Sequence, residues 1–261
     1  MNHAEESTEL TLTPRFVALT LGGVAAGVVA ASTFVLFVTH RMGSNPHEVR
    51  WAQFFYVDGE RNIPTAFSVL LLLMASVLLA VIARLERRSA RPFVGHWAVL
   101  SSGFALMAVD EGWSFHEKLN GPVRALLGNS ELGTFYYAWV LPAIVLVALL
   151  TLFFLRFLLQ LPVRTRIAFL LAAFFYVGGA VGIELLEGRF DEVHGDRNLV
   201  SGLLATVQEA GEMVGVIVFI WALLRYLGAH YGDLRLRLAA AHQVAVAPQR
   251  PAVSPIEPSP V

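Results

Sequence analysis

The chain has 261 residues, of which 56% are hydrophobic and only 15% are charged, and its mean hydropathy is +0.61. This composition argues against one or two soluble domains and predicts a membrane protein with several spans. The chain has no cysteine, which excludes disulfides, thiolate metal sites, iron–sulfur clusters and cysteine nucleophiles. The sequence shows no basic stripe and no nucleic-acid motif, so we expect no nucleic-acid partner.

The chain begins with a polar, acidic stretch, residues 1–14, which lacks the basic character of a signal peptide. The apolar stretch that follows, Phe16 to Thr39, has 24 residues. That length is too great for the hydrophobic region of a cleaved signal peptide. We therefore expect residues 1–14 to form a cytoplasmic tail and the next stretch to be a retained membrane span.

Six apolar segments predict transmembrane helices at residues 15–39, 64–84, 94–113, 132–156, 166–190 and 199–226. Each has at least ~15 residues with almost no charge, and several exceed the ~20 residues needed to cross a bilayer. The predicted fold is therefore all-α, a polytopic, multi-pass membrane bundle of six transmembrane helices within residues 15–228. Pro64 is expected in the first turn of the second helix, where its missing N–H costs nothing. Pro142 is expected to kink the fourth helix.

Glycines in the first and fifth segments are expected to allow close helix packing. They are Gly22, Gly23, Gly27, Gly178, Gly179 and Gly182. The tail at residues 229–261 ends in APQRPAVSPIEPSPV. Its many prolines and few large apolar groups predict a cytoplasmic, largely disordered segment.

Arginines set the expected orientation in the membrane. They gather in the short connections after the second and fourth segments and after the sixth: Arg84, Arg87, Arg88, Arg91, Arg156, Arg164, Arg166, Arg225, Arg235 and Arg237. Cytoplasmic connections carry an excess of Lys and Arg. The pattern predicts an N-in/C-in topology, in a cell membrane.

The acidic residues gather toward the opposite side. Fourteen of the 20 Asp and Glu residues lie in the connections expected to be extracytoplasmic or within the spans near them. Counting ~1.5 Å per residue from the nearest arginines places Asp110, Glu184 and Glu209 in the outer half of the ~30 Å hydrocarbon core. Acidic groups from the third, fifth and sixth helices are therefore expected to share one level and to meet in one pocket.

Helical spacing groups the acidic side chains further. Glu184, Glu187, Asp191 and His194 follow one stripe, Glu209 and Glu212 another, and Asp110, Ser114 and Glu117 a third. His116 lies off the third stripe. Either the backbone bends at Gly112, or His116 supports another ligand or points elsewhere.

Carboxylates in a membrane need protons, basic side chains or metal ions to neutralise them. The spans contain almost no Lys or Arg, and carboxylates with histidines suit iron, manganese or zinc. We therefore hypothesise a site for one or two divalent metal ions. The candidate ligands are Asp110, Glu111, His116, Glu117, Glu184, Glu187, His194, Glu209 and Glu212, with Glu60 as a candidate outer cover.

The ligand inventory is comparable to that of carboxylate-bridged di-iron sites in helix bundles. The spacing departs from theirs, because Glu-x-x-Glu occurs twice and Glu-x-x-His does not occur. Solvated ion pairs are the simpler interpretation for Asp191, Glu192 and Asp196, beside Arg189 and Arg197. A proton relay and a structural polar core remain alternatives for the whole set.

A metal site open to the extracytoplasmic side predicts a metal-dependent membrane oxidoreductase or hydrolase. Its expected substrate is a membrane lipid or another apolar small molecule. The alternatives are a proton or divalent-cation transporter that uses the same carboxylates, or a structural membrane subunit. The ionisable groups lie on one side only, which favours a one-sided site over a channel.

Overall fold

The computed structural model describes residues 9–11, 13–128, 131–232 and 235–237. The chain divides into two compact units, Leu12–Leu234 and the combination of Met1–Thr11 with Arg235–Val261. In the second unit, strand β1 (Glu9–Thr11) pairs antiparallel with β2 (Arg235–Arg237), with Leu10 opposite Leu236. The predicted disorder of residues 229–261 is wrong for the first of them, because helix α9 (Leu199–Tyr231) continues to Tyr231 and residues 235–237 form β2. Residues 233–234 and 238–261 lie outside the described residues.

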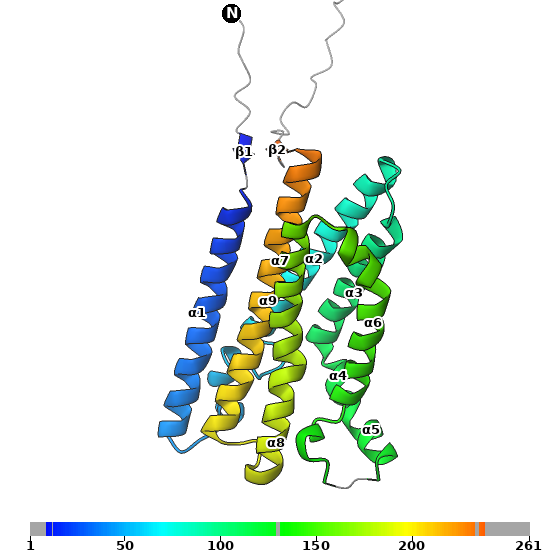
Figure 1. Cartoon of the computed structure of the whole chain (residues 1–261). Helices are drawn as coiled ribbons and strands as arrows, with labels where there is room; N and C mark the ends of the chain where they lie inside the picture. Colours follow the sequence, from blue (N-terminus) through cyan, green and yellow to red (C-terminus); the bar gives the residue numbers. More distant parts are fainter. Residues whose placement is uncertain (1–8, 12, 129–130, 233–234, 238–261) are drawn as a thin grey trace, which may run out of the picture. The chain divides into compact units, whose positions relative to one another are not determined.

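The unit Leu12–Leu234 is a bundle of long helices (Figure 1). Five single helices are long: α1 (Pro14–Arg41), α2 (Ile63–Arg88), α3 (Val94–Trp113), α6 (Val140–Gln160) and α9 (Leu199–Tyr231). One further long helix consists of three parts: α7 (Val163–Val177), the π-helix η4 (Gly178–Ile183) and α8 (Glu184–His194). The connections contain η1 (Pro46–Glu48), η2 (Ala52–Phe54), α4 (Phe115–Lys118), α5 (Asn120–Leu126) and η3 (Gly133–Phe135). Helices α7, η4 and α8 follow one another without a break.

Five helical segments are long and apolar enough to cross a membrane, which supports the assignment as a membrane protein. They are α1, α2, α6, the continuous α7–η4–α8 helix and α9. Each of the six predicted segments contains a helix, but α6 begins at Val140 and not at residue 132 as predicted. Helix α3 is not among the five. The sixth span and the N-in/C-in topology therefore stay predictions.

Capping residues explain where the long helices begin. Asn62 accepts a hydrogen bond from the backbone N–H of Thr65 at the start of α2, and Pro64 lies in the first turn as expected. Asn198 caps α9 in the same way. The expected kink at Pro142 is wrong, because α6 begins at Val140 and Pro142 therefore lies in its first turn, where no helical hydrogen bond is lost.

Helix α9 forms the centre of the bundle and packs against α1, α2, α7, η4 and α8. Within its most apolar stretch 61% of the residues are buried, against 17% in α6. Leu79 and Ile82 of α2 meet Ile220 and Leu223 of α9 in a core that is fully buried. This apolar core separates the two ends of the bundle.

Two glycines bring α9 into backbone contact with the α7–η4 helix. A Cβ at Gly179 would lie 2.7 Å from the carbonyl oxygen of Gln208, and a Cβ at Gly215 would lie 2.7 Å from the backbone nitrogen of Tyr176. Close packing at Gly179 confirms the expectation for that residue. The expectation is wrong for the other five predicted glycines, because a Cβ there would meet nothing within 4 Å: Gly22, Gly23, Gly27, Gly178 and Gly182.

The end of the bundle that carries the α2–α3 and α6–α7 connections, here called the arginine end, holds a buried carboxylate that the sequence analysis did not single out. Glu86 is 2% exposed. Its Oε1 accepts hydrogen bonds from the hydroxyls of Tyr226 and Tyr231, each at 2.7 Å. Arg91 lies 3.6 Å away. The group ties α2 to the last turns of α9.

Candidate functional site

The opposite end, here called the acidic end, contains the connections α1–α2, α3–α6 and α8–α9. Helix α3 stops at Trp113 because Ser114 adopts a left-handed backbone conformation, with φ of 47°. The chain then turns back, so that Asp110 accepts hydrogen bonds from both the backbone N–H and the ring of His116, at 2.9 and 2.6 Å. Of the alternatives left open for His116, a bend of the backbone occurs, but it lies at Ser114 and not at Gly112.

The ring of His116 is oriented by this carboxylate. Its Nδ1 faces Asp110, and Nε2 forms no hydrogen bond with the residues that the structure describes. The ring lies 4.5 Å from the indole of Trp139. Burial lowers the pKa of His116, but the hydrogen bond and charge of Asp110 and the charge of Glu117 outweigh it and raise that pKa overall. A carboxylate that holds one nitrogen of a histidine while the other stays free is the arrangement found beside metal ions.

Glu184 is the first residue after the π-helix and is 8% exposed. Its two oxygens accept hydrogen bonds from Trp139 Nε1 and Gln208 Nε2, both at 2.8 Å. Trp139 precedes α6 and Gln208 lies on α9, so Glu184 joins three elements. π-Helical turns are frequent at functional sites because they change the direction of the residues that follow.

Four carboxylates form what we call the central acidic cluster: Glu111, Glu184, Glu209 and Glu212, from α3, α8 and α9. The charge of Glu212 interacts with those of Glu111 and Glu184, and Glu209 interacts with all three. His116 interacts with Glu111 and Glu184 at the edge of the cluster. The three predicted helices therefore carry acidic residues whose charges act on one another. That these residues share one metal site stays a prediction.

Hydrogen-bond acceptors outnumber donors in the cluster. The donors that contact it are Trp139, Gln208 and Tyr176, and the charge of His116 acts on Glu184 without a hydrogen bond to it. Among the described residues, no Lys or Arg forms an ion pair with the four carboxylates. Gln208 Oε1 is the single buried side-chain N or O atom in the described part of the chain that lacks a hydrogen-bond partner. The interior is therefore short of positive charge and of protons to donate.

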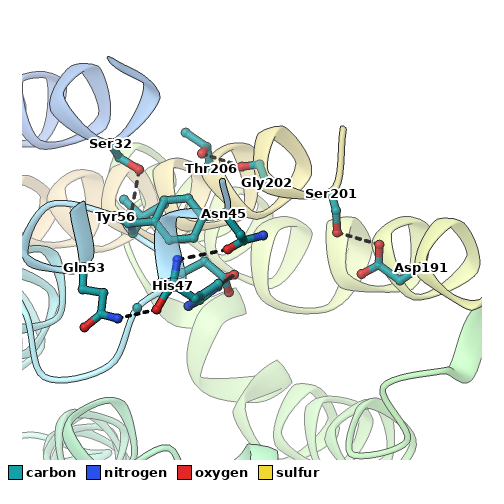
Figure 2. A network of polar contacts seen from close by, with 12 residues as sticks. Ser32, Asn45, His47, Gln53, Tyr56, Asp191, Ser201, Gly202 and Thr206 are labelled. Atoms are coloured by element: carbon teal, nitrogen blue, oxygen red, sulfur yellow. Dashed lines mark hydrogen bonds and ion pairs between the residues drawn. The ribbon is translucent and has the colours of Figure 1, made fainter. Parts of the chain in front are cut away.

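A second polar group, which we call the outer polar network, consists of Asp191 of α8 with Ser201 and Tyr137. Figure 2 shows the contact between Asp191 and Ser201. Asp191 is 2% exposed and accepts hydrogen bonds from the hydroxyls of Ser201 and Tyr137, at 2.6 and 2.8 Å. Burial and the hydrogen bond to Asp191 raise the pKa of Tyr137, which keeps it a donor at neutral pH. The interpretation of Asp191 as a solvated loop residue is wrong, because two donors hold it inside the bundle.

Glu187 is buried between the two groups and interacts with the charges of Glu184 and Asp191. It also interacts with Asp58 of the α1–α2 connection, which the sequence analysis did not consider. Glu192 does pair with Arg189, at 3.4 Å, as the ion-pair interpretation expects.

The remaining predicted residues lie at the margin. Glu117 and Glu60 are exposed, and their charges interact above the cluster. His194 is exposed, stacks on Phe190 and donates to its carbonyl oxygen at 3.1 Å, so it does not join the acidic residues. In the described residues, no three His, Asp or Glu side chains converge closely enough to hold a metal ion with these rotamers. A shared metal would therefore require side-chain rotation.

Several residues that complete the site carry no sequence signal of their own. Trp139 is interpreted from sequence as part of an aromatic belt, yet it donates to Glu184. Gln208 precedes Glu209 in the chain and also donates to Glu184. The position of Gln208, four residues before Glu212 on one helix, is the one signal that could have identified it.

The α1–α2 connection contains a pH-dependent contact, in which His47 Nε2 lies 3.1 Å from Asp58 Oδ2. This hydrogen bond raises the pKa of His47 above its ordinary value of 6.5, although burial acts in the opposite direction. The contact therefore stabilises the fold fully below that value and is lost as the pH rises through the raised pKa. Both side chains are about half exposed, so we expect this contact to contribute less than about 1 kcal/mol to the free energy of unfolding.

Thermal unfolding in detergent micelles at pH 6 and pH 8 checks this contact. We expect the stability of the wild type relative to His47→Gln to decrease from the lower to the higher pH. Asp58→Asn should remove the same pH dependence. An equal pH dependence in all three proteins would contradict the assignment.

Fold and site define a helical bundle, Leu12–Leu234, with five helices apolar enough to span a membrane and an acidic cluster among its helices. The chain belongs to the family described as "Domain of unknown function (DUF8692)", which matches residues 20–227. The match extends from α1 into α9 and contains every member of the cluster. No curated protein and no solved structure matches the chain.

Proposed function

We propose that the chain is a six-span protein of the cell membrane whose central acidic cluster binds one or two divalent metal ions, with iron, manganese and zinc as the candidates. The observation that carries the proposal is the excess of acceptors: four carboxylates whose charges act on one another have no Arg or Lys partner among the described residues, and the Oε1 of Gln208 beside them lacks a donor. Divalent ions would neutralise these charges and satisfy these oxygens together.

The side chains present suit such an ion. Glu111, Glu184, Glu209 and Glu212 supply oxygen ligands, and His116 supplies a nitrogen that Asp110 already orients. Trp139 and Gln208 hold Glu184 in place from the outside. Glu187 and Glu117 extend the acidic surface toward the connections.

We further propose an enzymatic role on a lipid or another apolar substrate, with the site facing the extracytoplasmic side. A bound metal would act as a Lewis acid or a redox centre there. The buried apolar core of α2 and α9 between the cluster and the arginine end supports a one-sided site. A transporter would need a polar path through that core.

Elemental analysis of the purified full chain tests the proposal. We expect near-stoichiometric metal in the wild type and its loss in Glu184→Gln and Glu209→Gln, because each substitution removes one charged ligand. Glu192→Gln is the matched control, since Glu192 contacts Gly133 and Arg189 outside the cluster. A wild type without metal would overturn the site, and metal-independent ion flux in proteoliposomes would then favour the transporter.

A further inference from the structure

A small cavity lies beneath the central acidic cluster, where four helices meet. Its volume is about 10 Å³, which is the space that one water molecule occupies. Its polar lining comes from a different helix in each case: Ser68 of α2, Glu111 of α3, Tyr176 of α7 and Glu212 of α9. Leu71, Leu72, Met213 and Val216 complete the wall.

Among the lining residues, Ser68 gives the strongest reason to expect a ligand in the cavity. It is 9% exposed, and its hydroxyl forms no hydrogen bond with any residue that the structure describes. Ser76, two turns further along the same helix, shows the contrast, because its hydroxyl donates to the carbonyl oxygen of Ser101 at 2.8 Å. The Ser68 hydroxyl lines the cavity and is not fully enclosed by protein atoms, so a ligand in the cavity would complete its interactions.

The other polar groups define the chemistry of that ligand. Tyr176 faces Glu212, whose charge interacts with that of Glu111. Two carboxylates and two hydroxyls offer oxygen atoms only, which suits a hard cation. Two negative charges are balanced by a divalent ion. The wall around them is dry, because Leu71, Leu72 and Met213 are at most 2% exposed.

We propose that this cavity holds one hard divalent cation, with Ser68, Glu111, Tyr176 and Glu212 as its ligands. The inference rests on the proposed function and deepens it. It adds Ser68 and Tyr176 to the predicted ligands and places one ion in the cavity that Glu111 and Glu212 of the cluster line. Manganese is the suitable probe, because free and bound Mn²⁺ differ in electron paramagnetic resonance.

Titration of the purified full chain with Mn²⁺, followed by that resonance, tests the inference. We expect one Mn²⁺ per chain in the wild type and about tenfold weaker binding in Ser68→Ala and in Tyr176→Phe, the scale seen when one supporting group of a metal is lost. Ser76→Ala is the matched control and should bind like the wild type. Both test substitutions remove a single oxygen, and thermal unfolding would confirm that the variants remain folded.

Each other outcome overturns a defined statement. If the wild type binds metal and Glu184→Gln loses it, while Ser68→Ala and Tyr176→Phe bind normally, the ion lies elsewhere in the cluster. The proposed function then stands and the cavity assignment is wrong. If Ser76→Ala weakens binding as much as Ser68→Ala, helix packing explains the effect and the assignment is again wrong. If the wild type binds no metal, both proposals are overturned.

Discussion

Replacing Gly215 by alanine is expected to destabilise the bundle by about 1–3 kcal/mol, the usual cost of overpacking a tight contact. The new Cβ would lie 2.7 Å from the backbone nitrogen of Tyr176 and 2.8 Å from the carbonyl oxygen of Ala172. Both are backbone atoms and cannot rotate away, so α7 and α9 must move apart. Thermal unfolding in detergent micelles measures the change.

Gly228→Ala provides the matched control on the same helix. A Cβ at Gly228 would meet nothing within 4 Å, and alanine favours a helix over glycine by up to ~1 kcal/mol. We therefore expect this variant to be as stable as the wild type or slightly more stable. Equal destabilisation by both substitutions would show that α7 and α9 are not in backbone contact at Gly215.

Removal of the buried carboxylate in Glu86→Ala is expected to cost about 3 kcal/mol. The substitution leaves the hydroxyls of Tyr226 and Tyr231 without their shared acceptor at the arginine end. It also leaves an empty space where the Glu86 side chain was, because Glu86 is only 2% exposed in the wild type. The same unfolding measurement should show a large decrease in stability.

Two milder variants separate the contributions to this contact. Tyr226→Phe removes one donor and should cost about 1 kcal/mol. Arg91→Ala should cost less than about 1 kcal/mol, because its side chain is 41% exposed and lies 3.6 Å from Glu86. Wild-type stability in Glu86→Ala, or an equal loss in Arg91→Ala, would contradict the role assigned to the tyrosines.

The helices could be predicted because their apolar segments are long and end at polar or capping residues. Asn62 and Asn198 mark the starts of α2 and α9 in the sequence itself. The start of α6 could not be predicted in the same way. The residues before it carry no charge and include several aromatic residues, so they resemble the end of a span, and the η3 turn at Gly133 shows that they belong to the connection.

The acidic cluster could be predicted from height alone, because helical rise places Glu184 and Glu209 at similar depths. The hydrogen-bond donors of the cluster could not be predicted from the sequence. Trp139 and Tyr176 are also plausible as lipid-facing or interfacial aromatics, and their contacts depend on how distant helices pack. The left-handed turn at Ser114 is likewise a tertiary effect, since serine has no strong preference for positive φ.

The π-helix between Val177 and Glu184 has a geometric consequence for the two helices that it joins. Residues in an α-helix advance by roughly 100° each, so eight residues after Tyr176 an unbroken α-helix would point Glu184 about 80° away. One residue absorbed in the wider turn reduces the offset to roughly 20°. The wider turn thus brings Tyr176 of α7 and Glu184 of α8 onto nearly the same face of the continuous helix. Both side chains can therefore point toward the interior of the bundle.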